Sequence, residues 1–408
     1  MNSQYIKFFR ESLIALGITI FGELITGSLW GSFYSKFLVI AGIIALIPVI
    51  GENRGNISGI FTSRLGTGLH LGSIKPSLRK RTKELNNTIL MNIVLTLTIP
   101  IWTSFVVFTF DYFTGGPTSY FQFLFVAIGA ALIMVCIQPI LTLVISFIVY
   151  EKGLDPDVVV YPIISVIADI ITSIAIYLMV SIEIILFPSS MTTSFEKLIE
   201  VLAISIFSLF IVLTFSKPIQ QKSHLDFELF NLLKESLPII LVSIIIGSIV
   251  GFILDNAVTI QGVVLILPIF MSYTGAVGSV IGSKFTTKYH LGALSTKTGK
   301  LDMYLFSPLI LISVCISLSA ILGVVAFTIS SYLNFSLPSS VTMISYVLAC
   351  VLIGIVTTSF SMVIALILGN LTFRRGLDAD NVIVPLSTTL GDLIAIISVI
   401  SITNLIFL

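Results

Sequence analysis

Long apolar segments recur along almost the whole chain, and they constrain the fold more than any other feature. Each is mostly apolar over about 18 residues or more, long enough to cross the hydrocarbon core of a bilayer as a helix. Eleven such segments lie near residues 12–35, 37–64, 87–113, 119–150, 158–187, 196–216, 237–255, 259–283, 301–330, 339–373 and 382–407. The runs are continuous and lack the alternating pattern of outer-membrane strands, so they predict helices and not a barrel.

The composition supports this assignment. Apolar residues make up 56% of the 408 residues and charged residues 10%, whereas soluble chains carry about 25% charged residues. These values exclude a soluble enzyme, a disordered chain and a nucleic-acid-binding protein. We therefore expect an all-α integral membrane protein with about eleven transmembrane helices.

Basic residues predict how the helices are oriented. Lys and Arg concentrate in the segments 73–86 and 284–300, and basic residues near the ends of short loops mark the cytosolic side. If both segments face the cytosol, only Lys36 and Lys197 fall on the other side. The prediction is a multi-pass protein of the plasma membrane with a cytosolic N-terminus and an external C-terminus.

The chain also contains an internal duplication. Residues 153–169 align without gaps to 376–392 with seven identities in seventeen positions, and residues 55–72 align in the same way to 275–292 with six identities. The two offsets, 223 and 220, are nearly the same. The duplication predicts a five-helix repeat over 1–188 and another over 236–408, joined by a linker over 189–235 that holds one additional helix. An odd linker helix makes the repeats parallel, related by a pseudo-twofold axis along the membrane normal.

Two aspartates lie inside the predicted spans at equivalent positions. Asp169 and Asp392 are each about two to three turns into the last span of their repeat, where a charged Asp costs about 2.5–3.5 kcal/mol on the mildest scale. Ser165 and Thr388 precede them by one turn on the same helical face. A pseudo-twofold axis would bring the carboxylates together, and they would repel each other unless a cation or a proton lay between them.

The ligand types indicate which cation. Oxygen ligands without His or Cys favour Mg²⁺ or Ca²⁺, and two carboxylates with nearby hydroxyls suit a mostly hydrated Mg²⁺. A protonated Asp that hydrogen-bonds to a neighbouring helix is the alternative for this pair.

Other polar residues lie in the second span of the first half. Glu52, Asn53 and Asn56 follow Pro48, and this pattern predicts a broken or kinked helix that lines a polar path. Arg54, which lies among them, is expected to pair with an acidic residue.

Two further features of the spans have open interpretations. Glu23 is near the centre of the first span and has no acidic counterpart in the second half, so it is either a coupling site for H⁺ or Na⁺ or a buried partner of Arg54. Small residues recur every four positions from Gly55 and from Gly275, which favours close packing of helices.

These motifs resemble those of a known family. GNISGIFTSRLGTGLHLG at 55–72 and GLDADNVIVPLSTTLGDL at 376–393 are similar to the two signatures of the MgtE-like divalent-cation transporters, especially solute carrier family 41. The resemblance implies Mg²⁺ transport without a resident cofactor, with Asp169 and Asp392 at the central ion site. It also implies a homodimeric pore fused into one chain, so we expect a monomeric pseudo-dimer, with further association left open. The second half departs from the pattern at Ala276, which replaces Asn56.

Two alternatives remain from the sequence. Oxygen ligands do not separate Mg²⁺ from Mn²⁺ or Ca²⁺, so another divalent cation is the first alternative. The remote alternative is an intramembrane aspartyl protease, because two Asp lie in spans and one of them ends the sequence TLGD. The expectation is a transporter and not an enzyme.

Overall fold

The computed structural model describes most of the chain, and all of its regular structure is helical. The described residues are 2–70, 72–77, 82–116, 118–152, 156–186, 240–255, 260–290, 296–374 and 379–407. No strand occurs among them. The prediction of an all-α protein is confirmed for this part of the chain.

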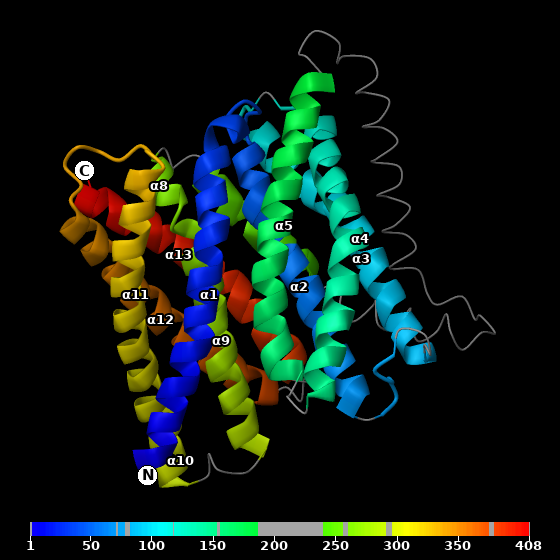
Figure 1. Ribbon diagram of the computed structural model, residues 1–408, viewed down its shortest axis with the longest axis vertical. Coiled ribbons are helices and arrows are strands. Elements are labelled where there is room, and N and C mark those ends of the chain that lie inside the picture. The colour runs from blue at the N-terminus through cyan, green and yellow to red at the C-terminus, as the bar shows by residue number, and fades with distance from the viewer. Residues whose placement is uncertain are drawn as a thin grey trace. The chain divides into compact units, whose positions relative to one another are not determined.

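The helices are long and follow the predicted spans. They are α1 (Asn2–Phe37), α2 (Ile43–His70), α3 (Lys83–Phe113), α4 (Tyr120–Glu151), α5 (Pro156–Leu186), α8 (Gln261–Val264), α9 (Leu267–His290), α10 (Lys297–Leu301), the π-helix η2 (Asp302–Phe306), α11 (Ser307–Tyr332), α12 (Met343–Arg374) and α13 (Ala379–Phe407). An additional apolar helix covers Ile240–Asp255. Figure 1 traces α2 to α5 from blue to green and α8 to α13 from green to red.

Eight helices in the described part of the chain are long and apolar enough to cross a membrane, by length and composition. The helix α2 is not among them, since its middle carries Glu52, Asn53, Arg54 and Asn56. The predicted span near 196–216 lies outside the described residues. The count of eleven spans therefore stays a prediction.

The chain divides into two compact units. The first unit combines Met1–Tyr34 with Asn256–Leu408, and the second unit is Ser35–Asp255. The first helix of each predicted repeat is thus grouped with the later helices of the other repeat. This exchange concerns α1 and the helix Ile240–Asp255.

In the second unit, α2 packs against α3, α4 and α5, and α4 lies between α3 and α5 in the contact order. Figure 1 shows α4 and α5 running side by side. The helix Ile240–Asp255 approaches α2 at two glycines. A Cβ on Gly251 would collide with the carbonyl oxygen of Ala45, and a Cβ on Gly247 would lie 2.5 Å from Oε2 of Glu52. A side chain at Gly251 would therefore push the two backbones apart, whereas one at Gly247 would displace the carboxylate of Glu52.

In the first unit, α9 packs against α12 and α13, and α11 packs against α12. The helix α1 meets the segment between α8 and α9 at Gly27, where a Cβ would collide with the carbonyl oxygen of Leu265. A Cβ on Gly275 would lie 2.9 Å from Cγ2 of Thr388. The predicted close packing of small residues is therefore confirmed at Gly275. At Gly55 no atom lies within 4 Å of such a Cβ.

The sequence predicts a broken or kinked helix in the first half, but the structure has a continuous helix there and a break in the second half. The helix α2 continues from Ile43 to His70 with Pro48 inside it. In the second half, α8 ends at Val264 and α9 begins at Leu267, so Pro268 falls in a first turn. A proline is tolerated there because the first N–H groups of a helix have no partner within it.

Candidate functional site

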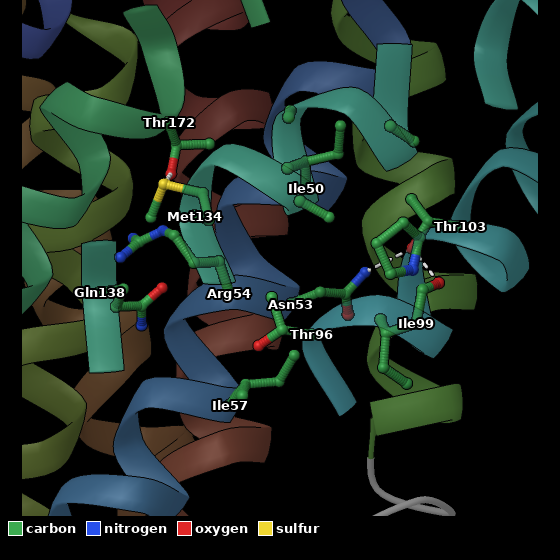
Figure 2. A pocket seen from close by; sticks show the side chains of 14 residues that line it. Ile50, Asn53, Arg54, Ile57, Thr96, Ile99, Thr103, Met134, Gln138 and Thr172 are labelled. Atoms are coloured by element: carbon green, nitrogen blue, oxygen red, sulfur yellow. Dashed lines mark hydrogen bonds between the residues drawn. The ribbon is translucent and has the colours of Figure 1, made fainter. Parts of the chain in front are cut away.

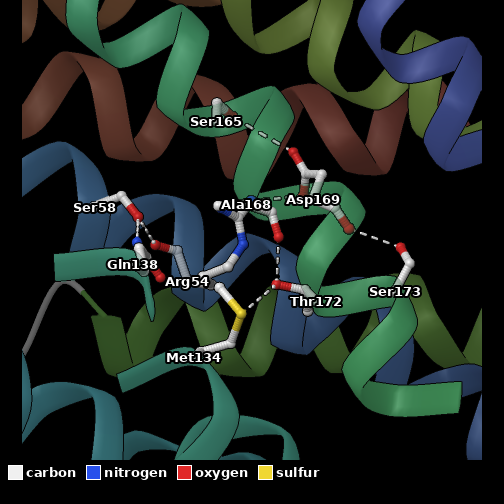
Figure 3. Close-up of polar contacts among 9 residues, drawn as sticks. All are labelled: Arg54, Ser58, Met134, Gln138, Ser165, Ala168, Asp169, Thr172 and Ser173. Carbon is white, nitrogen blue, oxygen red and sulfur yellow. Dashed lines mark hydrogen bonds and ion pairs between the residues drawn. The ribbon is translucent and has the colours of Figure 1, made fainter. Parts of the chain in front are cut away.

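In the second unit, the carboxylate of Asp169 on α5 forms an ion pair with Arg54 on α2. Nη2 of Arg54 lies 2.5 Å from Oδ1 of Asp169, and the two side chains are 7% and 18% exposed. The hydroxyl of Ser165 donates to Oδ2 of Asp169 at the long distance of 3.5 Å (Figure 3). The prediction that Arg54 pairs with an acidic residue is confirmed, and its partner is a predicted ion ligand. Glu23, the other partner suggested by the sequence, belongs to the first unit.

The backbone around this pair is held by side-chain hydrogen bonds. Ser58 donates to the carbonyl oxygen of Arg54 at 2.7 Å, and Gln138 of α4 donates through Nε2 to the hydroxyl of Ser58. On α5, Ser173 donates to the carbonyl oxygen of Asp169 at 2.8 Å. These hydrogen bonds connect α2 to α4 and hold the backbone at Arg54 and Asp169, from which the two charged side chains extend (Figure 3).

A small cavity lies beside Arg54 within the second unit. Its volume is about 40 Å³, and it is lined by Ile50, Asn53, Arg54, Ile57, Thr96, Ile99, Pro100, Thr103, Ala127, Ala130, Ala131, Met134, Gln138 and Thr172. Figure 2 shows Asn53 pointing toward Thr103 on α3, and its Nδ2 donates to that hydroxyl at 3.0 Å. Oδ1 of Asn53 and both Nε and Nη1 of Arg54 are buried and make no hydrogen bond within the described residues. The cavity is lined mostly by apolar side chains, and these three atoms lie at its polar part.

The predicted path-lining residues of α2 are buried, but their contacts lie on different helices. Glu52 and Asn56 are 9% and 8% exposed, and Asn53 is 3% exposed. Glu52 contacts the helix Ile240–Asp255 at Gly247, whereas Asn53 contacts α3 and Arg54 contacts α5. Glu52 and Asn53 therefore lie on different sides of α2. The lining of a path by Glu52, Asn53 and Asn56 stays a prediction.

The first unit places the equivalent aspartate in different surroundings. Asp392 on α13 is 8% exposed, and Thr388, one turn before it, packs against Gly275. The offset of 220 puts Thr274 at the position of Arg54. Thr274 donates its hydroxyl to the carbonyl oxygen of Phe270 at 2.5 Å, and its Cγ2 would lie 3.0 Å from a Cβ on Gly391. A small neutral side chain thus replaces the arginine of the first half.

The structure brings some predicted site residues together and leaves others unplaced with respect to each other. Asp169 and Ser165 belong to the second unit, whereas Asp392, Thr388 and Glu23 belong to the first. The predicted meeting of the two aspartates therefore stays a prediction. Among the described residues, no group of three or more His, Cys, Asp or Glu is arranged to hold a metal ion.

Sequence reasoning missed Gln138 and Thr103, which support α2 from neighbouring helices. Their only signal was polarity within an apolar span. Hydroxyl residues are common in such spans, where they bond to the carbonyl of the preceding turn, so polarity alone does not single out Thr103.

Comparison with known proteins agrees with the motifs. The sequence matches the MgtE family, described as divalent cation transporter, over residues 47–180 and again over residues 267–402. The two matched segments together cover more than half of the chain and begin after the first helix of each predicted repeat. No curated protein matches the chain significantly.

Two solved structures align with nearly the whole chain, but with low scores. They are the inward-facing and the outward-facing conformation of a multidrug resistance MATE family transporter of the MOP superfamily. The first is 15% identical over 97% of this chain and 95% of its own, with a TM-score of 0.35. The second is 14% identical over 98% and 94%, with a TM-score of 0.28. Scores this low carry no argument about fold or function.

Proposed function

The chain belongs to the MgtE family of divalent cation transporters, and on this premise we propose that it transports Mg²⁺ with Asp169 and Asp392 as ligands of the ion. One observation carries the proposal. Each of the two segments that match the family contains one buried or half-buried aspartate at the equivalent position of its last helix, with a hydroxyl residue one turn before it.

The ligand chemistry supports Mg²⁺ among the divalent cations. One turn before each aspartate the helix carries a hydroxyl residue, Ser165 before Asp169 and Thr388 before Asp392. Mg²⁺ gives up its water reluctantly and is commonly bound by one or two carboxylates with several waters retained. Mn²⁺ and Ca²⁺ accept the same oxygen ligands, so transport of another divalent cation is the competing function.

The arrangement in the membrane is part of the same proposal. We place eleven spans in the plasma membrane as two parallel repeats joined by a linker helix. The N-terminus is cytosolic and the C-terminus external, because basic residues concentrate in 73–86 and 284–300.

The test is flux through purified protein in liposomes that contain a Mg²⁺-sensitive dye. Asp392→Asn is expected to abolish Mg²⁺ uptake. Asp169→Asn alone would leave Arg54 buried without its counter-charge, which is strongly destabilising. The informative variant in the second unit is therefore Asp169→Asn combined with Arg54→Thr, which copies the neutral residue of the second half.

Glu183→Gln is the matched control. Glu183 is a buried carboxylate on α5, the helix of Asp169, and accepts a hydrogen bond from Nε2 of Gln122 at 2.8 Å. This variant should transport normally. Normal Mg²⁺ flux in both Asp392→Asn and the double variant would show that neither aspartate is a ligand of the transported ion. Competition of Mn²⁺ and Ca²⁺ in the same assay identifies the preferred ion.

A further inference from the structure

In the second unit, the guanidinium of Arg54 occupies the place that a cation would take on Asp169. Nη2 of Arg54 lies 2.5 Å from Oδ1 of Asp169, and the two side chains are 7% and 18% exposed. A Mg²⁺ ion bound directly to the same oxygen would lie about 2.0–2.1 Å from it. Two positive charges this close on one carboxylate oxygen repel each other, so binding of the cation to Oδ1 displaces the guanidinium.

The other carboxylate oxygen of Asp169 gives the cation a first point of contact. Oδ2 accepts a hydrogen bond from the hydroxyl of Ser165 at 3.5 Å, a distance at the upper limit for such a bond, which is therefore weak. The side chain of Asp169 is also more exposed than that of Arg54. A hydrated cation can therefore approach Oδ2 and Ser165 first and weaken the attraction of Asp169 for Arg54 before the ion pair breaks.

A displaced Arg54 has space to move within the second unit. Its side chain lines the cavity of about 40 Å³, which Met134, Gln138 and Thr172 also line (Figure 2). Nε and Nη1 of Arg54 and Oδ1 of Asn53 are buried and make no hydrogen bond within the described residues. Buried polar groups normally have partners. The cavity thus combines unused donors of Arg54 with an unused acceptor that a shifted guanidinium can approach.

The cavity offers the displaced guanidinium no counter-charge. None of the described residues that line it is acidic. Glu52, the glutamate nearest in sequence, is about 200° around the helix from Arg54 and contacts Gly247. A buried charge without a partner is unfavourable, so Arg54 returns to Asp169 once the cation has left. The ion pair is thus the resting state, and the guanidinium stays in the cavity only while a cation occupies the carboxylate.

We propose that Arg54 substitutes for the transported cation when the site is empty. It neutralises Asp169, withdraws into the cavity when a divalent cation binds, and returns when the cation leaves. A carboxylate in a membrane span without a partner charge is costly, and a carrier meets this cost whenever its site returns empty across the membrane. With Arg54 in place, Asp169 has a positive partner both with the ion and without it. The inference rests on the proposed function and adds that net transport needs no second ion at Asp169.

The experiment compares two fluxes through purified protein in liposomes whose membrane potential is clamped with a potassium ionophore. Net uptake into Mg²⁺-free liposomes requires the site to return empty, whereas exchange of isotopically labelled Mg²⁺ against internal Mg²⁺ does not. Both are measured at about pH 8.5, where Asp169 is least able to take a proton instead.

Arg54→Gln removes the charge and keeps hydrogen-bonding groups. It should slow net uptake by about tenfold or more, because Asp169 returns without a partner charge, and leave exchange within about twofold of the wild-type rate. Arg54→Lys, which keeps a positive charge, should retain faster net uptake than Arg54→Gln. Glu183→Gln, the matched control, should retain both fluxes.

The outcomes separate this inference from the proposed function. Equal slowing of net uptake and exchange in a folded Arg54→Gln protein, or no slowing of either, overturns the role of Arg54 and leaves Mg²⁺ transport intact. If Arg54→Gln does not fold, the wild-type protein decides. Internal Mg²⁺ that accelerates uptake of labelled Mg²⁺ by about tenfold or more shows that the empty site returns slowly and overturns the proposal, whereas an unchanged rate supports it. Absence of any divalent cation flux in the wild-type protein overturns both the inference and the proposed function.

Discussion

The buried ion pair between Arg54 and Asp169 allows a quantitative test. Two unit charges 2.5 Å apart attract by about 7 kcal/mol at an effective dielectric constant of about 20, and loss of hydration opposes most of this. Removing one partner leaves the other charge buried and is expected to cost about 3–5 kcal/mol. Removing both leaves no unpaired charge. The double variant Arg54→Thr with Asp169→Asn should therefore be more stable than either single variant.

Reversible unfolding in mixed micelles, followed by circular dichroism, measures the free energy of unfolding of the four proteins in this cycle. We expect a coupling energy of at least about 3 kcal/mol. Arg54→Lys, which keeps the positive charge, should lose less stability than Arg54→Thr. Independent sites add within about 0.5 kcal/mol, so additive costs in the cycle would refute the inference that the pair is desolvated and mutually dependent.

The same variants should change the affinity for a divalent cation. Arg54 neutralises the charge of Asp169 while the two residues are paired, so Asp169 then contributes little to the attraction of a cation. Arg54→Thr removes the competing positive charge and leaves the carboxylate of Asp169 available to a cation. We expect Mg²⁺ to bind at least about tenfold more tightly to this variant, as measured by titration calorimetry. Equal or weaker binding by a folded Arg54→Thr protein would show that Arg54 does not compete with the ion.

Three further predictions use the same unfolding assay. Gly275→Ala should destabilise the protein by about 1–3 kcal/mol, because the added Cβ has no room, whereas Gly55→Ala should be neutral or stabilising; equal costs would contradict the difference in packing. Lys284→Met should cost about 1 kcal/mol, because its ammonium lies 3.7 Å from the centre of the Phe8 ring and 3.8 Å from a carboxylate oxygen of Asp302 in a partly exposed site; an unchanged stability would show that these contacts contribute nothing. Mg²⁺ at about 100 times its dissociation constant should add about 2.7 kcal/mol, and Asp392→Asn should lose this gain.

The helices and the ion pair were predictable for simple reasons. Apolar runs longer than a bilayer crossing leave a chain few options besides helices. A buried Arg needs a counter-charge, so an acidic partner for Arg54 followed from its place between Asn53 and Gly55 in a predicted span. The identity of the partner did not follow, because Glu23 and Asp169 were equally available to a linear reading.

Other features depend on tertiary packing and left no clear signal in the sequence. The repeats align along the chain, but this alignment does not determine whether the first helix packs with its own repeat or with the other one. Pro48 and Pro268 are equivalent in sequence, yet one lies inside a continuous helix and the other follows a break. The same close approach of a glycine accompanies both backbones, Gly251 in one unit and Gly27 in the other, so neither the proline nor this contact alone explains the break.

The two halves of the chain differ in the charged residues of their second helices. By the offset of 220, Glu52 corresponds to Ser272 and Arg54 corresponds to Thr274. The change from Arg54 to Thr274 alters the charge beside Asp169, one of the two aspartates proposed to bind the ion. The two aspartates of a duplicated site are thus expected to contribute unequally to cation binding, with Asp392 the stronger ligand while Arg54 remains paired with Asp169.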